Sequence, residues 1–83
     1  MIELDPIIDT GPARVAAIVE RSLASGASPA LWFCGAKHPL AILVRHNGRT
    51  QCFDAAGAQI APDELERRYP GQLARFERLV DAP

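Results

Sequence analysis

Both cysteines and both histidines of this chain lie within residues 33–57, where they could bind a metal ion or form a thiol active site. Two thiolates and two imidazoles are a common ligand set for tetrahedral zinc. A thiol can instead act as a nucleophile when an imidazole accepts its proton and a carboxylate orients the imidazole. The residues concerned are Cys34, His38, His46, Cys52 and Asp54.

The spacing of the cysteines and histidines argues against zinc. Zinc modules usually begin from a close pair such as Cys-x2–4-Cys, and neither Cys34-x3-His38 nor His46-x5-Cys52 is such a pair. We therefore expect no metal and no cofactor. In this interpretation Cys34 and Cys52 are small buried hydrophobic residues, and His38 and His46 lie on exposed loop edges.

Asn47-Gly48 lies between two runs rich in β-forming residues and predicts a type I′ hairpin turn, because both residues tolerate positive φ. In a two-residue loop His46 faces Arg49, which separates His46 from Cys52 by three pair positions, or about 10 Å along the strands. The two side chains then also point to opposite faces of the sheet. Only a three-residue loop would return both to one face and let them share a metal.

Cys34, His38 and Asp54 supply the three chemical types of a thiol active site. Cys34 would end a strand, and His38 on the adjoining loop could approach it. A domain of this size, however, has difficulty enclosing a substrate pocket while keeping a core. We expect a protein that is not an enzyme, with a thiol-dependent enzyme or its remnant as the alternative. Without catalysis, Asp54 is a strand-end residue that accepts hydrogen bonds from the following turn.

Residues 38–57 resemble the histidine-to-aspartate segment of the adenovirus-protease and ubiquitin-like-protease group of cysteine proteases. By that resemblance His38 would be the base and Asp54 its orienting acid. The pattern departs from the group at Pro39, where an aromatic residue is usual, and no cysteine follows Asp54 to serve as the nucleophile. The resemblance covers about a quarter of the chain, and we do not assign the chain to that group.

Net charge and composition argue against nucleic-acid binding and against membrane insertion. The net charge is −1 and the isoelectric point about 6.0, whereas nucleic-acid binders usually carry a cationic surplus. The first residues lack the basic flank and apolar core of a signal peptide, and no apolar run approaches a membrane span. We expect a cytoplasmic protein that binds neither nucleic acid nor membrane. Arginine almost replaces lysine and alanine is abundant, which is typical of a GC-rich bacterial or phage genome.

The elements that position these residues begin with a predicted N-terminal helix over residues 9–26. Asp9 or Thr10 could cap it, Pro12 suits its first turn, and Gly26 suits the position after its end. Residues at helical spacing form one apolar stripe, namely Val15, Ile18, Val19, Ser22 and Leu23. Such a helix would pack on a sheet.

The remainder of the chain predicts strands and two helices. Strands are expected at residues 30–35, 40–46 and 49–55, with shorter pieces at 2–5 and 58–60. Asp63 and Glu66 fit a capping box for a helix over 63–69, Pro70 ends that helix, and residues 70–82 predict an amphipathic helix. The fold class is therefore a single α+β domain over residues 1–83, with a three-stranded antiparallel sheet between an N-terminal helix and C-terminal helices.

Trp32 and Phe33 are neighbours in a predicted strand and must point to opposite faces. One packs under a helix, and the other is either covered by a second layer or exposed as an interaction anchor. If the helices cover only one face, an open apolar surface remains around Leu31 or Trp32 together with Ile42, Val44 and Phe53.

Arg75 and Arg78 place positive charge on the last predicted helix, where they could border a binding surface. Acidic residues interleave with them, so a solvated face of mixed charge is the simpler interpretation. Taken together, the sequence predicts a small non-enzymatic module that binds another protein or associates with itself. The protein-binding residues would be Trp32, Phe33, Arg75 and Arg78.

Overall fold

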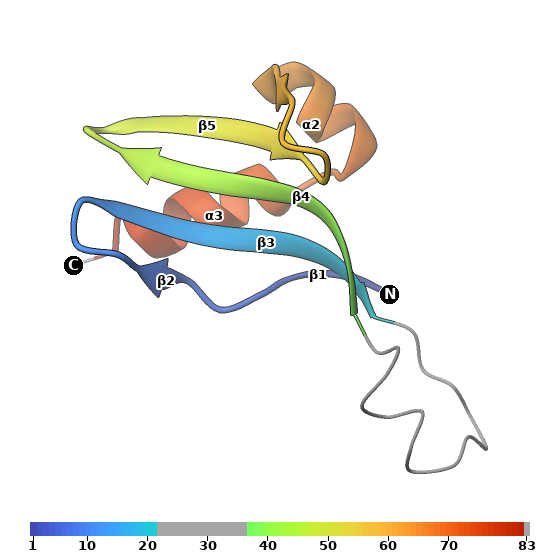
Figure 1. Ribbon diagram of the computed structural model, residues 1–83, viewed down its shortest axis with the longest axis horizontal. Coiled ribbons are helices and arrows are strands. Elements are labelled where there is room, and N and C mark those ends of the chain that lie inside the picture. The colour runs from blue at the N-terminus through green and yellow to red at the C-terminus, as the bar shows by residue number, and fades with distance from the viewer. Residues whose placement is uncertain (22–36, 83) are drawn as a thin grey trace, which may run out of the picture.

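A computed structural model of the chain describes residues 1–21 and 37–82 (Figure 1). The strands are β1 (Ile2–Leu4), β2 (Ile8–Asp9), β3 (Ala13–Arg21), β4 (Lys37–His46), β5 (Arg49–Asp54) and β6 (Gln59–Ile60). The helices are α2 (Pro62–Arg68) and α3 (Gln72–Val80). The described part of the chain is therefore mostly sheet, followed by two short helices at its C-terminal end.

All six strands belong to one antiparallel sheet in the order β1-β3-β4-β5-β6. β2 also pairs with β3, so β1 and β2 follow one another along the same edge of that strand. β3 and β4 pair from end to end, with a register shift between Ile18 and Val19 that leaves Leu40 without a partner on β3, and they form the centre of the sheet. The predicted three-stranded sheet is wrong, because residues 13–21 of the region assigned to the N-terminal helix form β3, and β1, β2 and β6 extend the sheet further.

The predicted N-terminal helix is wrong for residues 13–21, which form β3. Val15, Ile18 and Val19 fit a helical stripe, but this short run fits a strand equally well, and periodicity alone does not separate the two. The run is rich in β-branched side chains, which favour strands. Hydrogen bonding to β1 and β2 on one side and to β4 on the other favours the strand over the helix.

The residues expected to cap that helix form the turn between β2 and β3. The backbone N–H of Gly11 donates to Asp9 Oδ1 at 2.9 Å, and that of Ala13 donates to Thr10 Oγ1 at 3.1 Å. Gly11 has a φ of +96°, a conformation that suits glycine. Asp and Thr satisfy backbone donors in turns as they do at helix starts, so the capping pattern predicted the wrong element.

The Asn-Gly hairpin is confirmed. Asn47 and Gly48 both have positive φ, 51° and 73°, and join β4 to β5 with His46 opposite Arg49. The short strand predicted near the N-terminus and the extension after the hairpin are present as β1 and β6. The strand predicted at 30–35 lies outside the described residues.

Both C-terminal helices are present, but the first begins without a capping box. Its N-cap is Ala61, which makes no side-chain cap hydrogen bond, and Pro62 occupies the first turn. Glu66 instead reaches the next turn, where its Oε1 accepts from the backbone N–H of Gly71 at 3.1 Å. The helix ends at Arg68, one residue before the expected end at Tyr69, which is instead the C-cap residue before Pro70.

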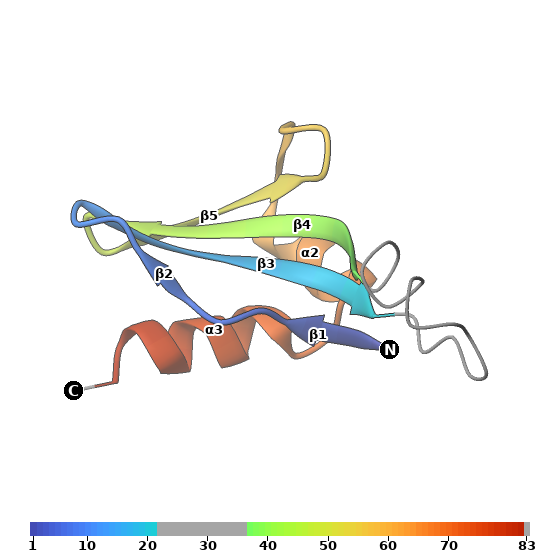
Figure 2. The ribbon, with the colours of Figure 1, turned by 60° about the horizontal axis from the view of Figure 1, so that its bottom comes forward.

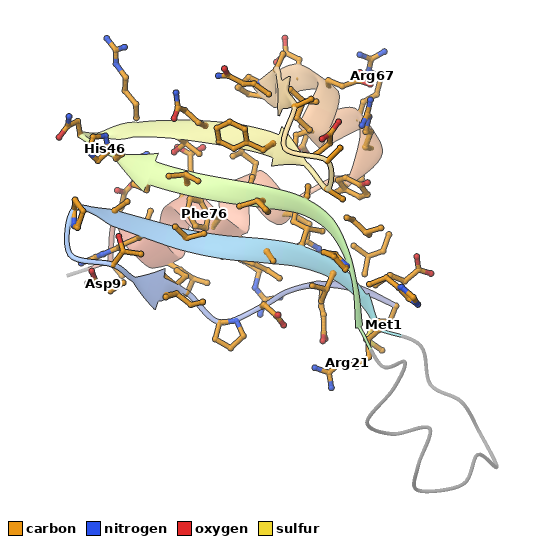
Figure 3. The ribbon with its side chains drawn as sticks, viewed as in Figure 1. Met1, Asp9, Arg21, His46, Arg67 and Phe76 are labelled. Carbon is orange, nitrogen blue, oxygen red and sulfur yellow. The ribbon has the colours of Figure 1, made fainter. Side chains whose placement is uncertain are left out.

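Both helices pack on the same face of the sheet (Figure 2). The hydrophobic core lies between the helices and the sheet. It consists of Ala16, Ile18, Ala41, Leu43, Cys52, Leu65, Phe76 and Val80. Phe76 of α3 is fully buried at the centre of this layer (Figure 3). We call this side of the sheet the covered face.

Two sheet arginines hold the C-terminal end of α3. Arg14 Nη1 donates to the carbonyl oxygen of Val80 at 2.6 Å. Arg45 Nη2 contacts Asp81 Oδ1 at 2.8 Å, and its Nη1 contacts Glu77 Oε2 at 3.3 Å. Cationic groups are favourable near the last turn of a helix, where carbonyl groups lack intrahelical partners. These contacts fix the register of α3 on the sheet.

Candidate functional site

The second face of the sheet carries a group of apolar side chains. Because side chains alternate along a strand, the residues next to the core positions point away from the helices. Cross-strand pairing aligns Ala17, Ile42 and Phe53 in one row and Val15 beside Val44 in the next, with Ile8 opposite Val15. We call this group the open face, and it consists of Ile8, Val15, Ala17, Ile42, Val44 and Phe53.

Neither helix lies over the open face (Figure 2). Five of its residues are half-buried among their neighbours on the strands, and Ile8 is 64% exposed. On the covered face, by contrast, Ile18, Ala41 and Leu43 are all 0% exposed. An antiparallel sheet with one solvated face normally carries polar residues on that face. Here both faces are apolar.

Polar and charged side chains border the open face at both ends of the strands. At the hairpin end His46, Arg49 and Gln51 line a shallow depression together with Asn47. At the other end Glu3 and Arg21 form an ion pair with Arg21 Nε 2.6 Å from Glu3 Oε1. An apolar centre with a polar border is the arrangement found in protein–protein interfaces.

None of the four residues predicted to bind protein is found on the open face. Trp32, Phe33 and Cys34 lie outside the described residues. Arg75 and Arg78 are exposed on α3, which packs on the covered face, so they do not border the open face. The expectation that Ile42, Val44 and Phe53 share one face is confirmed by the hairpin register.

The hairpin separates the metal-binding residue types that it carries. His46 is exposed at the border of the open face, whereas Cys52 lies on the covered face and is 1% exposed. Burial raises the pKa of the Cys52 thiol, and the nearby Glu77 carboxylate raises it further. In residues 1–21 and 37–82 no group of three or more histidine, cysteine, aspartate or glutamate side chains is arranged to hold a metal ion.

Asp54 has the turn role expected for a strand-end residue. Its Oδ1 accepts from the backbone N–H groups of Ala56 and Ala58, each at 2.9 Å. His38 lies on β4 three positions beyond Ala41, the partner of Asp54, which corresponds to about 10 Å along the strands. The structure therefore does not bring His38 and Asp54 together, and Cys34 falls outside its described part.

Sequence reasoning missed the contribution of β2 and β3 to the open face. Val15 and Ala17 belonged to the predicted helix, and Ile8 to no element. The signal that could have placed Val15 and Ala17 is their alternation with Ala16 and Ile18, preceded by a turn-forming Thr-Gly-Pro. If residues 15–18 are treated as a strand, in which side chains alternate between two faces, both faces are apolar.

Comparisons with protein-family models, curated proteins and solved structures give no significant match to this chain. Within the described residues, no helix is long and apolar enough to cross a membrane.

Proposed function

We propose that the protein is a small non-enzymatic protein-binding module whose contact surface is the open face. The surface that it binds is flat and apolar at its centre. The observation that carries this proposal is the apolar character of a sheet face that the two helices leave uncovered.

Exposed apolar area explains why such a face binds. Each square ångström of apolar surface removed from water contributes about 25 cal/mol, and a flat sheet presents its side chains together. Contiguous apolar patches on soluble monomers are often contact sites. Valine and isoleucine on strands lose little side-chain entropy when they are covered, because their χ1 angles are already restricted.

The rigid support of the open face favours the same function. Ala16, Ile18, Leu43 and the other core residues fix β3, β4 and β5 from behind, and the arginine contacts hold α3 on that core. A surface carried by strands with a packed reverse side changes little on binding, which lowers the entropic cost of association.

Site-specific photo-crosslinking tests the proposal. A benzophenone amino acid replaces Phe53 on the open face in cells that express the protein, and the control carries the same group at Leu79, which is 49% exposed on α3. We expect covalent protein adducts from position 53 that decrease strongly in Val44→Lys, and few from position 79. Absence of any protein adduct from position 53, in cells and in concentrated purified protein, would contradict the proposal.

A further inference from the structure

We infer that the depression at the end of the β4–β5 hairpin is a binding site for a phosphate group, which accepts hydrogen bonds from His46, Arg49 and Gln51. The depression adjoins the open face. It would bind its ligand whether or not that face binds protein, so this site goes beyond the function proposed above.

The hairpin register brings the three side chains to one side of the sheet. His46 on β4 lies directly opposite Arg49 on β5, and Gln51 follows Arg49 by two residues, so all three point to the side of the open face. Asn47 occupies the turn at the tip of the hairpin, next to His46 (Figure 3). The two-residue turn fixes the spacing of the backbone positions from which these side chains extend.

The side chains surround an open depression of about 460 Å³, lined by His46, Asn47, Arg49 and Gln51. This volume lies within the range of small-molecule sites, which are usually lined by apolar side chains. Here all four described lining residues are polar, so an apolar ligand would gain little. The depression therefore suits a small polar ligand.

The chemistry of the lining favours an anion. The guanidinium group of Arg49 has five N–H donors and no acceptor, and the carboxamides of Asn47 and Gln51 each supply two N–H donors. The imidazole of His46 adds another N–H donor. No carboxylate occurs among the described lining residues. A guanidinium group binds phosphate oxygens through paired N–H donors, which makes Arg49 the main contact.

The charge of Arg49 distinguishes it from the other arginines on the described strands. The other three pair with carboxylates, namely Arg14 with Asp9, Arg21 with Glu3, and Arg45 with Glu77 and Asp81. Arg49 is exposed and forms no ion pair with any residue of 1–21 or 37–82. Its positive charge is therefore available to an anion from solution.

The arrangement of the donors favours phosphate over carboxylate. His46 and Arg49 extend from neighbouring strands, and Gln51 extends from a position further along β5, so the three donors do not lie on one line. A phosphate group has its oxygens in a tetrahedral arrangement and can accept from all three, whereas a carboxylate has two oxygens in one plane. Because the donors are exposed and salt screens them, we expect a dissociation constant on the order of millimolar.

An NMR titration of the ¹⁵N-labelled protein with inorganic phosphate at constant ionic strength tests the site. We expect saturable shifts of the amide signals of residues 46–51. Arg49→Met should weaken binding about 10-fold or more, and Arg49→Lys about 3-fold, because an ammonium group keeps the charge without the paired donors. The control Arg75→Met removes an equal charge from an exposed position on α3 and should change the dissociation constant less than about 2-fold. The amide spectrum of each variant shows whether it is folded.

Two further ligands identify the bound group. Acetate should bind at least about 5-fold more weakly than phosphate, because it offers fewer acceptors. Phenyl phosphate distinguishes an organic phosphate ester from the free ion, since Val44 lies opposite Gln51 on the same face and could contact the ring. Tighter binding of phenyl phosphate supports an ester as the ligand, and equal binding supports free phosphate.

Three outcomes would overturn the inference. The first is a set of shifts that rise linearly up to about 50 mM phosphate, because a millimolar site would be saturated there. The second is an equal loss in Arg75→Met and Arg49→Met, which would show that phosphate only screens surface charge. The third is equal binding of acetate and phosphate. None of these bears on the open face, which crosslinking from position 53 tests separately.

Discussion

The two faces of the sheet are built from alternate residues of the same strands and are both apolar, yet in the described part of the chain helices cover only one of them. Leu43 points into the core and is fully buried, whereas the next residue, Val44, points to the open face and is half-buried. Residue type therefore does not distinguish the faces. What distinguishes them is the pair of C-terminal helices, which pack on one face and, within residues 1–21 and 37–82, leave the other without a covering helix.

This comparison assigns different roles to neighbouring positions. Residues of the covered face contribute to the free energy of unfolding, because they are removed from water within one chain. Residues of the open face contribute chiefly to association, because their remaining exposed area is lost only when a second surface arrives. Substitutions on adjacent residues of β4 should therefore separate stability from binding.

The largest effect is expected from Leu43→Ala on the covered face. It removes a fully buried side chain from the centre of the core and leaves a cavity, so the free energy of unfolding should fall by about 2–5 kcal/mol. Urea denaturation followed by circular dichroism measures this change. A loss below about 1 kcal/mol would show that the helices do not pack on this face as described.

A smaller loss is expected from Arg45→Met, which keeps much of the apolar stem but removes the contacts with Thr50, Glu77 and Asp81. These contacts are partly exposed, so solvent screening limits their value to about 1–2 kcal/mol. Hydrogen exchange should increase most in the last turn of α3. Uniform exchange across the protein would indicate that Arg45 does not hold that turn. Arg49→Met serves as the control, because Arg49 is exposed and forms no ion pair with the other described residues.

Val44→Lys on the open face should change monomer stability by no more than about 1 kcal/mol, because a long side chain on a solvated face can extend into water. The same change should abolish binding through the open face, since it places a cation in the apolar centre of that surface. Urea denaturation at low protein concentration measures the first effect. Unfolding of the variant would show that Val44 belongs to a core, which would remove the difference between the two faces.

The smallest effect concerns the pH dependence contributed by Cys52. Its pKa is raised in the folded protein, so the unfolded chain loses the thiol proton at lower pH than the folded chain does. Stability from this group is complete below the unfolded pKa, which is near 9.0, and is lost as pH rises through the higher folded value. Unfolding of Cys52→Ala between neutral and alkaline pH should show a shallower decline than the parent protein.

Alkylation offers a second measurement of the same residue. Native Cys52 should react slowly with iodoacetamide, because the thiol is buried and largely protonated, and the rate should rise on unfolding in urea. Rapid modification of Cys52 in the native protein would contradict its place on the covered face.

Local signals in the sequence predicted the elements that depend on local chemistry. Asn47-Gly48 defined the hairpin and its register, and that register placed Ile42, Val44 and Phe53 on one face. β3 could not be identified in the same way, because Val15, Ile18 and Val19 fit both periods and the choice depends on pairing with β4.

The candidate surface was accordingly only half predictable. Its β4 and β5 residues followed from the hairpin, whereas Val15 and Ala17 became visible only when β3 was recognised as a strand. The expectation that the C-terminal arginines border the surface had no local signal behind it, and α3 carries Arg75 and Arg78 on the other side of the sheet. Exposed charges do not reveal which face their helix covers.

The most direct test of the account is photo-crosslinking from position 53 in the parent sequence, in Val44→Lys and in Leu79→Lys. The parent sequence and Leu79→Lys should give protein adducts, and Val44→Lys should remain folded and give few. Adducts that persist undiminished in Val44→Lys, or a parent protein that gives none, would contradict the claim that the open face binds protein.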